Sequence, residues 1–213
     1  KTTAVILAAG QGTRMKSSLP KVLHPVAGKP LVHYPVRAAL EAGCGEVVVV
    51  VGHGREAVEA YLAKAFGAPG DGADPRSAER SWAGRVKTAV QKEQRGTGDA
   101  AKAGLSAVRP EAERILLFYG DVPMLAAEDV AAVARKLDEE PGAVVAIATC
   151  TTEDPFGYGR VMRDAKGNIL EIREQRDLKS DAERAVKEWN PGIYAATRRF
   201  FEDALSSLEP NNA

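Results

Sequence analysis

Short apolar runs alternate with amphipathic stretches along the first 150 residues of the chain. The runs are continuous rather than interrupted by polar residues, which is typical of strands buried on both faces of a parallel sheet. They lie at residues 3–9, 47–51, 114–119 and 143–149. Between them, apolar residues recur three and four positions apart, which predicts helices at about 30–43, 55–66, 97–108 and 126–139. This alternation predicts an α/β fold with a doubly wound, mostly parallel sheet, whose ligands bind at the carboxyl ends of the strands.

The pattern changes after residue 150, where we expect a smaller, β-rich part. The segment YGRVMRDAKGNILEIREQ, residues 158–175, predicts a hairpin that turns at Lys166-Gly167-Asn168. The segment GIYAATRRFFEDAL, residues 192–205, predicts a strand followed by a helix. Residues 67–85 are rich in Gly, Pro and charge and contain an isolated Trp82, so we expect an exposed and mobile excursion there.

Composition indicates an ordinary globular protein and excludes several classes. The chain is 45% hydrophobic and 27% charged, and its 29 basic residues balance its 29 acidic ones, so bulk charge gives no reason to expect a nucleic-acid partner. No apolar run approaches the roughly 18 residues of a membrane span, and no signal-peptide pattern is present. Cys44 and Cys150 lack metal-site spacing, and we expect both to be small core residues in a reducing compartment. These features favour a cytoplasmic protein with no membrane partner.

Charge is uneven at the beginning of the chain. The first acidic residue is Glu41, although the average acid frequency would place roughly five acids before it. Six basic residues precede it, namely Lys1, Arg14, Lys16, Lys21, Lys29 and Arg37. Three of these lie in LAAGQGTRMKSSLPK, residues 7–21, directly after the first predicted strand. We therefore expect an anionic ligand at this end of the fold.

The same loop has the composition of a phosphate cradle, although a plain turn would also use glycines. Backbone N–H groups of Gly10, Gly12 and Thr13 could bind phosphate oxygens, with Arg14 adding a bidentate charge. The dinucleotide fingerprint is excluded because Met15 stands where it needs a third glycine. The P-loop is excluded because Pro30 follows Gly28-Lys29, where that motif needs Ser or Thr.

Four further segments carry candidate site residues, each with an ordinary structural alternative. Asp121 follows the strand at 114–119, where it is either a turn residue or, opposite a phosphate loop, a ligand for Mg²⁺. Gln91 and Gln94 have amides that can recognise the edge of a base, and Thr97 beside them could cap a helix. The remaining two are Asn190, before a Pro-Gly turn, and Glu174, which is by itself typical of a solvated strand residue.

Taken in order, these segments resemble a known family. The motifs LAAGQGTRM with LPK, QKEQRGTG, YGDVP, GYGRV and NPGIY are similar to those of the sugar-1-phosphate nucleotidyltransferases. The chain most resembles the N-terminal uridylyltransferase domain of the bifunctional bacterial enzymes that make UDP-N-acetylglucosamine, and the likeness runs from residue 3 to about residue 200. The resemblance implies a Rossmann-like nucleotidyltransferase fold. It divides the chain into a nucleotide-binding half, 1–150, and a sugar-binding half, 151–213.

The resemblance also implies a role for each matched position. Arg14 and Lys21 would hold the phosphates of UTP and stabilise the charge that develops as pyrophosphate leaves. Asp121 would bind Mg²⁺. The backbone of the first loop would contact the nucleotide, and the segments after it would contact uracil, line the site and hold the sugar. These positions are Leu7, Ala8, Ala9 and Gly10 for the nucleotide, Gln91, Gln94, Gly96 and Thr97 for uracil, Tyr119 and Gly120 for the lining, and Gly159, Glu174 and Asn190 for the sugar.

The implied reaction is uridylyl transfer from UTP to N-acetylglucosamine 1-phosphate, which gives UDP-N-acetylglucosamine and pyrophosphate for cell-envelope synthesis. The related enzymes carry a further Mg²⁺-binding asparagine and a trimeric β-helix after the point where this chain stops, at Ala213. The chain is then either a fragment, which we expect, or a family member that ends differently, and the resemblance implies a homotrimer for the parent of such a fragment. Pro191 replaces the usual Thr after the matched asparagine. Two alternatives remain open: a related transferase for another sugar 1-phosphate, and a nucleotide-binding module without catalysis. Met15 also argues against a dehydrogenase.

Overall fold

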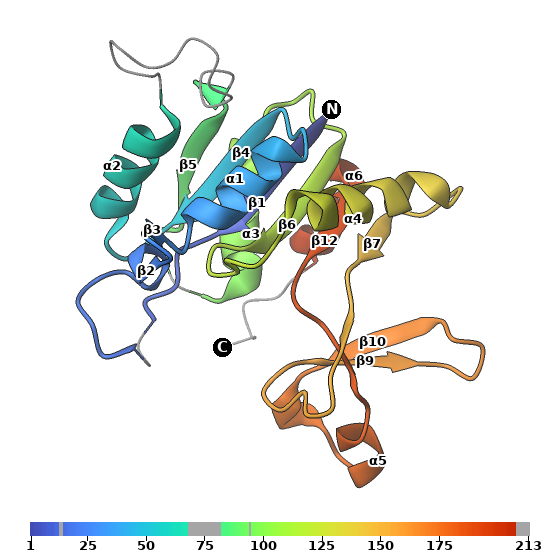
Figure 1. Cartoon of the computed structure of the whole chain (residues 1–213). Coiled ribbons are helices and arrows are strands. Elements are labelled where there is room, and N and C mark those ends of the chain that lie inside the picture. Colours follow the sequence, from blue (N-terminus) through green and yellow to red (C-terminus); the bar gives the residue numbers. More distant parts are fainter. Residues whose placement is uncertain (13–14, 68–81, 94, 208–213) are drawn as a thin grey trace.

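A six-stranded sheet carries most of the apolar runs of the chain (Figure 1). The computed structural model describes residues 1–12, 15–67, 82–93 and 95–207. Four strands are parallel, in the order β5 (Val86–Val90), β4 (Glu46–Val51), β1 (Thr2–Leu7) and β6 (Arg114–Tyr119). The sheet continues with β12 (Tyr194–Thr197), antiparallel to β6, and ends with β7 (Val145–Ile147), antiparallel to β12. The predicted α/β class and mostly parallel sheet are confirmed.

Helices cover both faces of this sheet and form two hydrophobic cores. Helices α1 (His33–Glu41), α2 (Arg55–Phe66) and α4 (Ala127–Glu139) pack on one face, together with inward side chains such as Ile6 and Val49. Helices α3 (Thr97–Ala107) and α6 (Arg198–Ser206) pack on the other, with Val5 and Val50. Because neighbouring residues of a strand point to opposite faces, a continuous apolar run supplies both cores at once.

A second, smaller sheet lies below the first in Figure 1 and joins it through two extended segments. Its strands, in spatial order, are β10 (Ile169–Arg173), β9 (Arg160–Arg163), β11 (Glu188–Trp189) and β8 (Cys150–Thr151). The predicted hairpin is confirmed: β9 and β10 are antiparallel, and the Asp164 carboxylate accepts bonds of 2.8 Å from the N–H groups of Lys166 and Asn168. The short helix α5 (Asp181–Arg184) connects β10 to β11. The β-rich insertion after residue 150 is thus present.

Some local predictions are wrong. The run at 143–149 forms only the short, half-buried edge strand β7, which pairs antiparallel with β12 instead of joining a parallel neighbour as predicted, in the part of the chain that the structure describes. The first predicted helix begins later, at His33, because the hairpin of β2 (Pro25–Val26) and β3 (Lys29–Pro30) precedes it. Cys44 is buried as expected, but Cys150 is exposed because it lies in β8, at the edge of the small sheet.

Trp82 contradicts the prediction of an exposed excursion at 67–85. Its side chain is 7% exposed, and its ring lies 6.2 Å from that of Phe66 at the end of α2, so it belongs to the core. The strand β5 follows directly and was not predicted, because Lys87 and Thr88 interrupt its apolar pattern. Residues 68–81 lie outside the described part of the chain. In the part that the structure describes, no helix has the length and apolar character needed to cross a membrane.

Candidate active site

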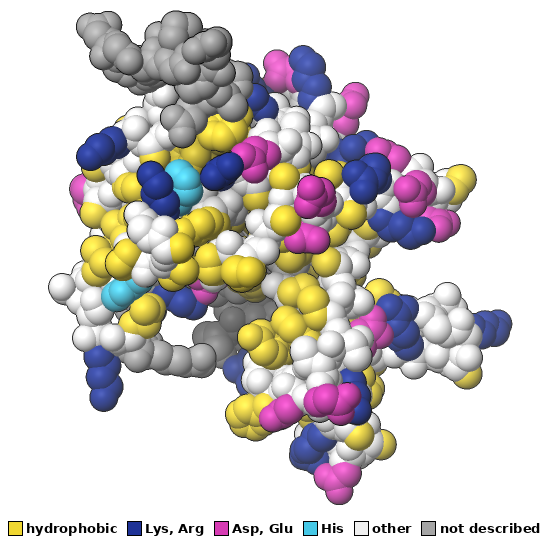
Figure 2. Space-filling model, viewed as in Figure 1, with side chains coloured by type: hydrophobic (Ala, Val, Ile, Leu, Met, Phe, Trp, Pro, Cys, Tyr) yellow, Lys and Arg dark blue, Asp and Glu magenta, His cyan; other side chains and the backbone are white. Residues whose placement is uncertain are grey.

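A pocket of about 870 Å³ lies where the carboxyl ends of the parallel strands face the small sheet. In the space-filling view, the surface is hollowed between the upper body and the lower lobe (Figure 2). Both parts of the molecule supply its walls. The predicted residues that line the pocket are Leu7, Ala8, Ala9, Gly10, Lys21, Gln91, Gly96, Thr97, Tyr119, Asp121, Gly159, Glu174 and Asn190. Arg14 and Gln94 lie outside the described residues.

Gly120 stands directly behind this lining and holds two strand ends together. Its N–H donates to the carbonyl oxygen of Leu7 at 2.8 Å, which continues the pairing of β6 with β1. A Cβ at this position would lie 3.0 Å from the Cβ of Ala8, which is tighter than most real Cβ contacts. The small residues after β1 and β6 therefore let the backbones converge at the floor of the pocket.

A cation and a carboxylate meet on that floor. Lys21, at the start of a 3₁₀ turn (Lys21–Leu23), forms an ion pair with Asp121, which lies two residues after β6. The two side chains are 42% and 26% exposed, so both remain open to the pocket. Gly12 packs on the stem of Lys21: a Cβ there would lie 2.6 Å from the Cβ of Lys21, and its φ of +64° also favours glycine.

The wall formed by β5 and α3 contains a buried amide. Gln91 is 7% exposed, and its Nε2 donates to the carbonyl oxygen of Gly96 at 3.1 Å and to Asp99 at 3.0 Å. The helix starts at Thr97, with Gly96 in the N-cap position at a φ of 102°, so the alternative interpretation of Thr97 as the helix cap is wrong. Asp99 was not among the predicted residues, because an acid in the first turn of a helix is ordinary in a sequence.

Two tyrosines lie at the ends of β6 and β12, on the side of the large sheet that the connecting segment reaches. Burial raises the pKa of Tyr119, and nearby Glu174 and Asp121 add to this rise. Burial also raises the pKa of Tyr194, whose hydroxyl lies 2.6 Å from Nδ2 of Asn190. Both phenols are therefore neutral over the physiological range, and they can act as hydrogen-bond partners rather than as charges.

Asn190 fixes the connection between the two sheets. Its N–H donates to the carbonyl oxygen of Gly159 at 2.9 Å, and its Oδ1 accepts from the N–H of Gly192, also at 2.9 Å. The side chain is thus held on both sides of the turn that Pro191 and Gly192 make. The structural and site interpretations of Asn190 are compatible, because the same residue shapes the turn and lines the pocket.

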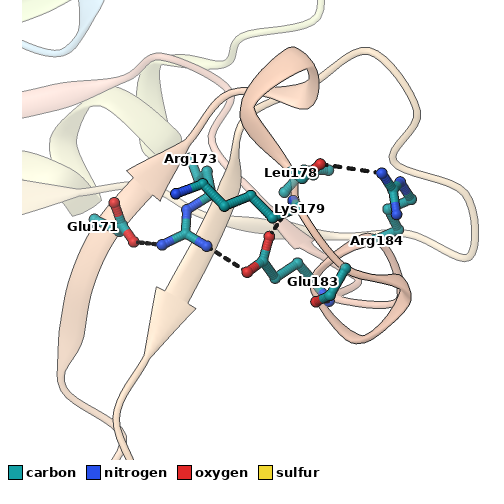
Figure 3. A network of polar contacts seen from close by, with 7 residues as sticks. Glu171, Arg173, Leu178, Lys179, Glu183 and Arg184 are labelled. Carbon is teal, nitrogen blue, oxygen red and sulfur yellow. Dashed lines mark hydrogen bonds and ion pairs between the residues drawn. The ribbon is translucent and has the colours of Figure 1, made fainter.

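Glu174 enters the pocket from the end of β10, and a polar network holds that end (Figure 3). Arg173 forms ion pairs with Glu171 and, at 2.6 Å, with Glu183 of α5. Glu183 also accepts the N–H of Lys179, and Arg184 donates to the carbonyl oxygen of Leu178 at 3.1 Å. Gly159 leaves room beside Glu174, since a Cβ there would lie 3.2 Å from its Oε1.

The loop before β9 adds residues that sequence reasoning missed. Phe156 and Tyr158 line the pocket, and Phe156 is 75% exposed. Arg160, only 2% exposed, donates to the carbonyl oxygen of Tyr158 and, at 2.9 Å, to Gln175, which also accepts the N–H of Gly157. Phe156 directly precedes the motif GYGRV and Tyr158 lies within it, but only Gly159 of that motif was among the predicted residues.

The pocket has oxygen ligands for a hard cation, and the phosphates of a bound substrate would complete the coordination shell of that cation. Its carboxylates are Asp121 and Glu174. Within the described residues, no group of three or more His, Cys, Asp or Glu side chains is arranged to hold a metal ion. Mg²⁺ is commonly held by one or two carboxylates, substrate phosphates and water rather than by a protein cage. Asp121 already faces a cation, the Lys21 ammonium, and therefore fits this type of site.

Comparison with known proteins places this arrangement among nucleotidyltransferases. Over 99% of its length the chain is 47% identical to the bifunctional protein GlmU of Sorangium cellulosum (strain So ce56) and 44% identical to that of Anaeromyxobacter dehalogenans (strain 2CP-C). It spans about two fifths of these relatives, 42% and 40% of their lengths.

Solved structures share the fold at low sequence identity. UDP-glucose pyrophosphorylase in complex with UDP-glucose superposes with a TM-score of 0.73 at 21% identity, over 99% of this chain and 82% of that one. The 4-diphosphocytidyl-2C-methyl-D-erythritol synthase of Anaerococcus prevotii superposes with a TM-score of 0.62 at 15% identity, over 98% of this chain and 76% of that one. The profile of the MobA-like NTP transferase domain matches residues 4–188. The resemblance drawn from the motifs is thus confirmed, and the chain belongs to the family of MobA-like NTP transferase domains.

Proposed function

We propose that the chain transfers a uridylyl group from UTP to N-acetylglucosamine 1-phosphate, giving UDP-N-acetylglucosamine and pyrophosphate. The observation that carries the proposal is one pocket with two kinds of wall. The edge of the large sheet presents Lys21, Asp121 and the buried Gln91, while the small sheet presents Glu174. The first wall suits a nucleoside triphosphate and the second suits a sugar.

The nucleotide lies along the large sheet in this proposal. The backbone of Leu7, Ala8, Ala9 and Gly10 contacts the nucleoside and phosphates, and Lys21 pairs with the phosphates. Gln91, Gly96 and Thr97 bind uracil. Arg14 and Gln94 belong to the same segments and have the same assigned roles, as phosphate and uracil ligands. Gly120 contributes through its backbone, which joins the ends of β6 and β1 at the floor of the pocket.

The sugar lies against the small sheet. Glu174 is an acceptor for sugar hydroxyls, Asn190 presents its amide near the junction of sugar and ribose, and Gly159 allows the ring to approach the strand. The motifs GYGRV and NPGIY, which resemble those of the N-acetylglucosamine enzymes, support this choice of sugar. The proposed sugar-binding half, 151–213, includes most of the small sheet, while β12 and α6 of the same half pack with the large sheet. The division of roles near residue 150 is part of the proposal.

The chemistry follows from these positions. A phosphate oxygen of the sugar phosphate attacks the α-phosphorus of UTP, and the new P–O bond replaces the bond to the bridging oxygen of pyrophosphate. The attacking oxygen is already anionic, so no side-chain base is needed. Lys21 and Arg14 stabilise the charge that moves onto the leaving pyrophosphate, and the pocket aligns the two substrates.

Magnesium is the proposed cofactor, with Asp121 as its ligand from this chain. When bound, Mg²⁺ neutralises phosphate charge and orients the phosphate oxygens. Asp121 needs no rearrangement of the backbone for this role, because its carboxylate already faces the pocket beside Lys21. The proposed setting is the cytoplasm, where UTP is available and the product is a precursor of the cell envelope.

The test is pyrophosphate release from UTP and Mg²⁺ in three parallel reactions: with N-acetylglucosamine 1-phosphate, with glucose 1-phosphate and without sugar. We expect release that depends on the N-acetyl sugar. Release with glucose 1-phosphate alone would contradict the proposed sugar. Binding of UTP without release in any reaction, repeated with a longer version of the protein, would contradict catalysis.

A further inference from the structure

The orientation of the Gln91 amide is determined by its neighbours. Its Nε2 lies 3.1 Å from the carbonyl oxygen of Gly96 and 3.0 Å from Oδ2 of Asp99. A backbone carbonyl and a carboxylate oxygen both accept hydrogen bonds and cannot donate. The NH₂ group must therefore face them, because the flipped amide would place an oxygen against two acceptors in a buried position.

This orientation leaves the oxygen of Gln91 for a ligand. Both N–H bonds of the amide are used, and within the described residues no donor lies at hydrogen-bond distance from Oε1. The residue is 7% exposed and lines the pocket together with Gly96 and Thr97. The oxygen is not one of the fully buried unpartnered atoms, so it is open to the pocket, where a ligand can supply an N–H to it.

We propose that Asp99 is a positioning residue that sets the base preference of the site by holding Gln91 as an acceptor. Uracil carries an N–H at ring position 3, whereas cytosine carries a lone pair there. An acceptor facing this position binds uracil and opposes cytosine. The proposal rests on the proposed function, because it assumes that a pyrimidine nucleotide lies in this pocket.

Asp99 also has an ordinary structural role that the test must separate. It lies in the first turn of α3, where a negative charge stabilises the N-terminus of the helix. A residue that acts only in this way would affect all nucleotides equally. Asp129 provides the matched control, because it lies in the first turn of α4, accepts the N–H of Ala126 at 3.0 Å and does not line the pocket.

The experiment compares the binding and turnover of UTP with those of CTP in three variants, Asp99→Asn, Asp99→Glu and Asp129→Asn. Binding with Mg²⁺ is followed by calorimetry, and kcat/KM is followed by pyrophosphate release. In Asp99→Asn the new amide can donate as well as accept, so only the Gly96 carbonyl oxygen still opposes a flip of Gln91. We expect its preference for UTP over CTP to fall about tenfold or more. Asp99→Glu keeps the carboxylate and should retain more of the preference, while Asp129→Asn should leave it unchanged.

N3-methyl-UTP supplies a second test that needs no variant. It lacks the N–H at position 3, so the unaltered protein should bind it at least tenfold more weakly than UTP. Equal binding of UTP and CTP by the unaltered protein, or an unchanged preference in a folded Asp99→Asn, would overturn the role of Asp99. Absence of pyrophosphate release while the binding preference behaves as expected would instead contradict the proposed transfer and leave the base preference standing.

Discussion

At the scale of single residues, Lys21 is placed by the backbone around it as well as by its charge. The 3₁₀ turn fixes its position after Pro20, and Gly12 packs against its Cβ. Its ammonium meets Asp121 at the floor of the pocket. Because the stem is already held, a substrate phosphate needs only to draw the end of the side chain toward itself. Such a preorganised cation stabilises developing charge at little reorganisation cost.

We therefore expect Lys21→Ala to lower kcat for uridylyl transfer by about 10²-fold or more, since a charge that stabilises the leaving group is lost. The half-exposed side chain contributes little to packing, so the melting temperature should change only slightly. Steady-state pyrophosphate release and thermal unfolding measure the two effects. Lys64→Ala is the control, because Lys64 is exposed on α2 and does not line the pocket. Near-normal turnover in Lys21→Ala would remove Lys21 from the proposed chemistry.

The pocket residues differ in how far sequence alone could identify them. Asp121 follows a buried strand, so its place at the carboxyl edge of the sheet was predictable from the fold class. Glu174 was not, because by itself it is typical of a solvated strand residue and only the family resemblance pointed to it. Asp99 was missed by both routes, since its contact with Gln91 depends on how α3 lies against β5.

At the scale of secondary-structure elements, ion pairs connect neighbouring elements of the small sheet. Arg163 of β9 donates to both oxygens of Glu188 in β11, at 2.7 Å each, across neighbouring strands. This bond lowers the pKa of Glu188 below its ordinary value of 4.5. Hydrogen bonds from the backbone of Lys179 and from Arg173 lower the pKa of Glu183 in the same way.

The direction of these shifts fixes the expected pH dependence. A carboxyl group whose pKa is lowered in the folded state contributes its full stability above pH 4.5 and loses it as the pH falls through the folded value. Glu188→Gln should therefore reduce the free energy of unfolding at pH 7, and the difference from the unaltered protein should shrink as the pH falls below 4.5. Urea unfolding followed by the fluorescence of Trp189, in a Trp82→Phe background, measures this.

Glu153 supplies the comparison for that experiment. It pairs with Lys187 in the same part of the molecule, but its side chain is 91% exposed. Exposed ion pairs contribute little to stability, so Glu153→Gln should change the unfolding free energy by well under about 1 kcal/mol at either pH. If Glu188→Gln changed the unfolding free energy by the same amount at both pH values, the ionised carboxylate of Glu188 would not be the source of the stabilisation.

The elements themselves were predictable where a single periodicity dominated. The buried strands β1, β4 and β6 and the helices α2 and α3 lie within a few residues of their predicted positions. A strand buried on both faces leaves a continuous apolar run, whereas a helix buried on one face leaves apolar residues three and four positions apart. The strand β5 was missed because it lies at the edge of the sheet, where polar Lys87 and Thr88 are tolerated. The burial of Trp82 depends on a distant helix, which no local pattern reports.

At the scale of the whole molecule, the pocket exists because two sheets meet at a narrow junction. The segment between β11 and β12 crosses from the small sheet to the large one and passes Tyr119 at the end of β6. Gly192 makes that passage possible. Its φ is +78°, and a Cβ there would lie 2.2 Å from Cε2 of Tyr119. Any larger residue would have to displace the ring that forms part of the pocket wall.

Substitution at this junction should therefore affect stability and activity together. Gly192→Ala forces alanine into the left-handed conformation, which costs about 1–2 kcal/mol, and adds a clash with Tyr119 that costs about 1–3 kcal/mol more. Gly142→Ala is the matched control, because its φ of +83° carries the same conformational cost while a Cβ there has no atom within 4 Å. We expect Gly192→Ala to lower both the free energy of unfolding and kcat/KM, and Gly142→Ala to lower only the former, by the smaller amount. Chemical denaturation and pyrophosphate release measure the two quantities, and equal effects of the two variants on both would mean that the contact with Tyr119 does not shape the pocket.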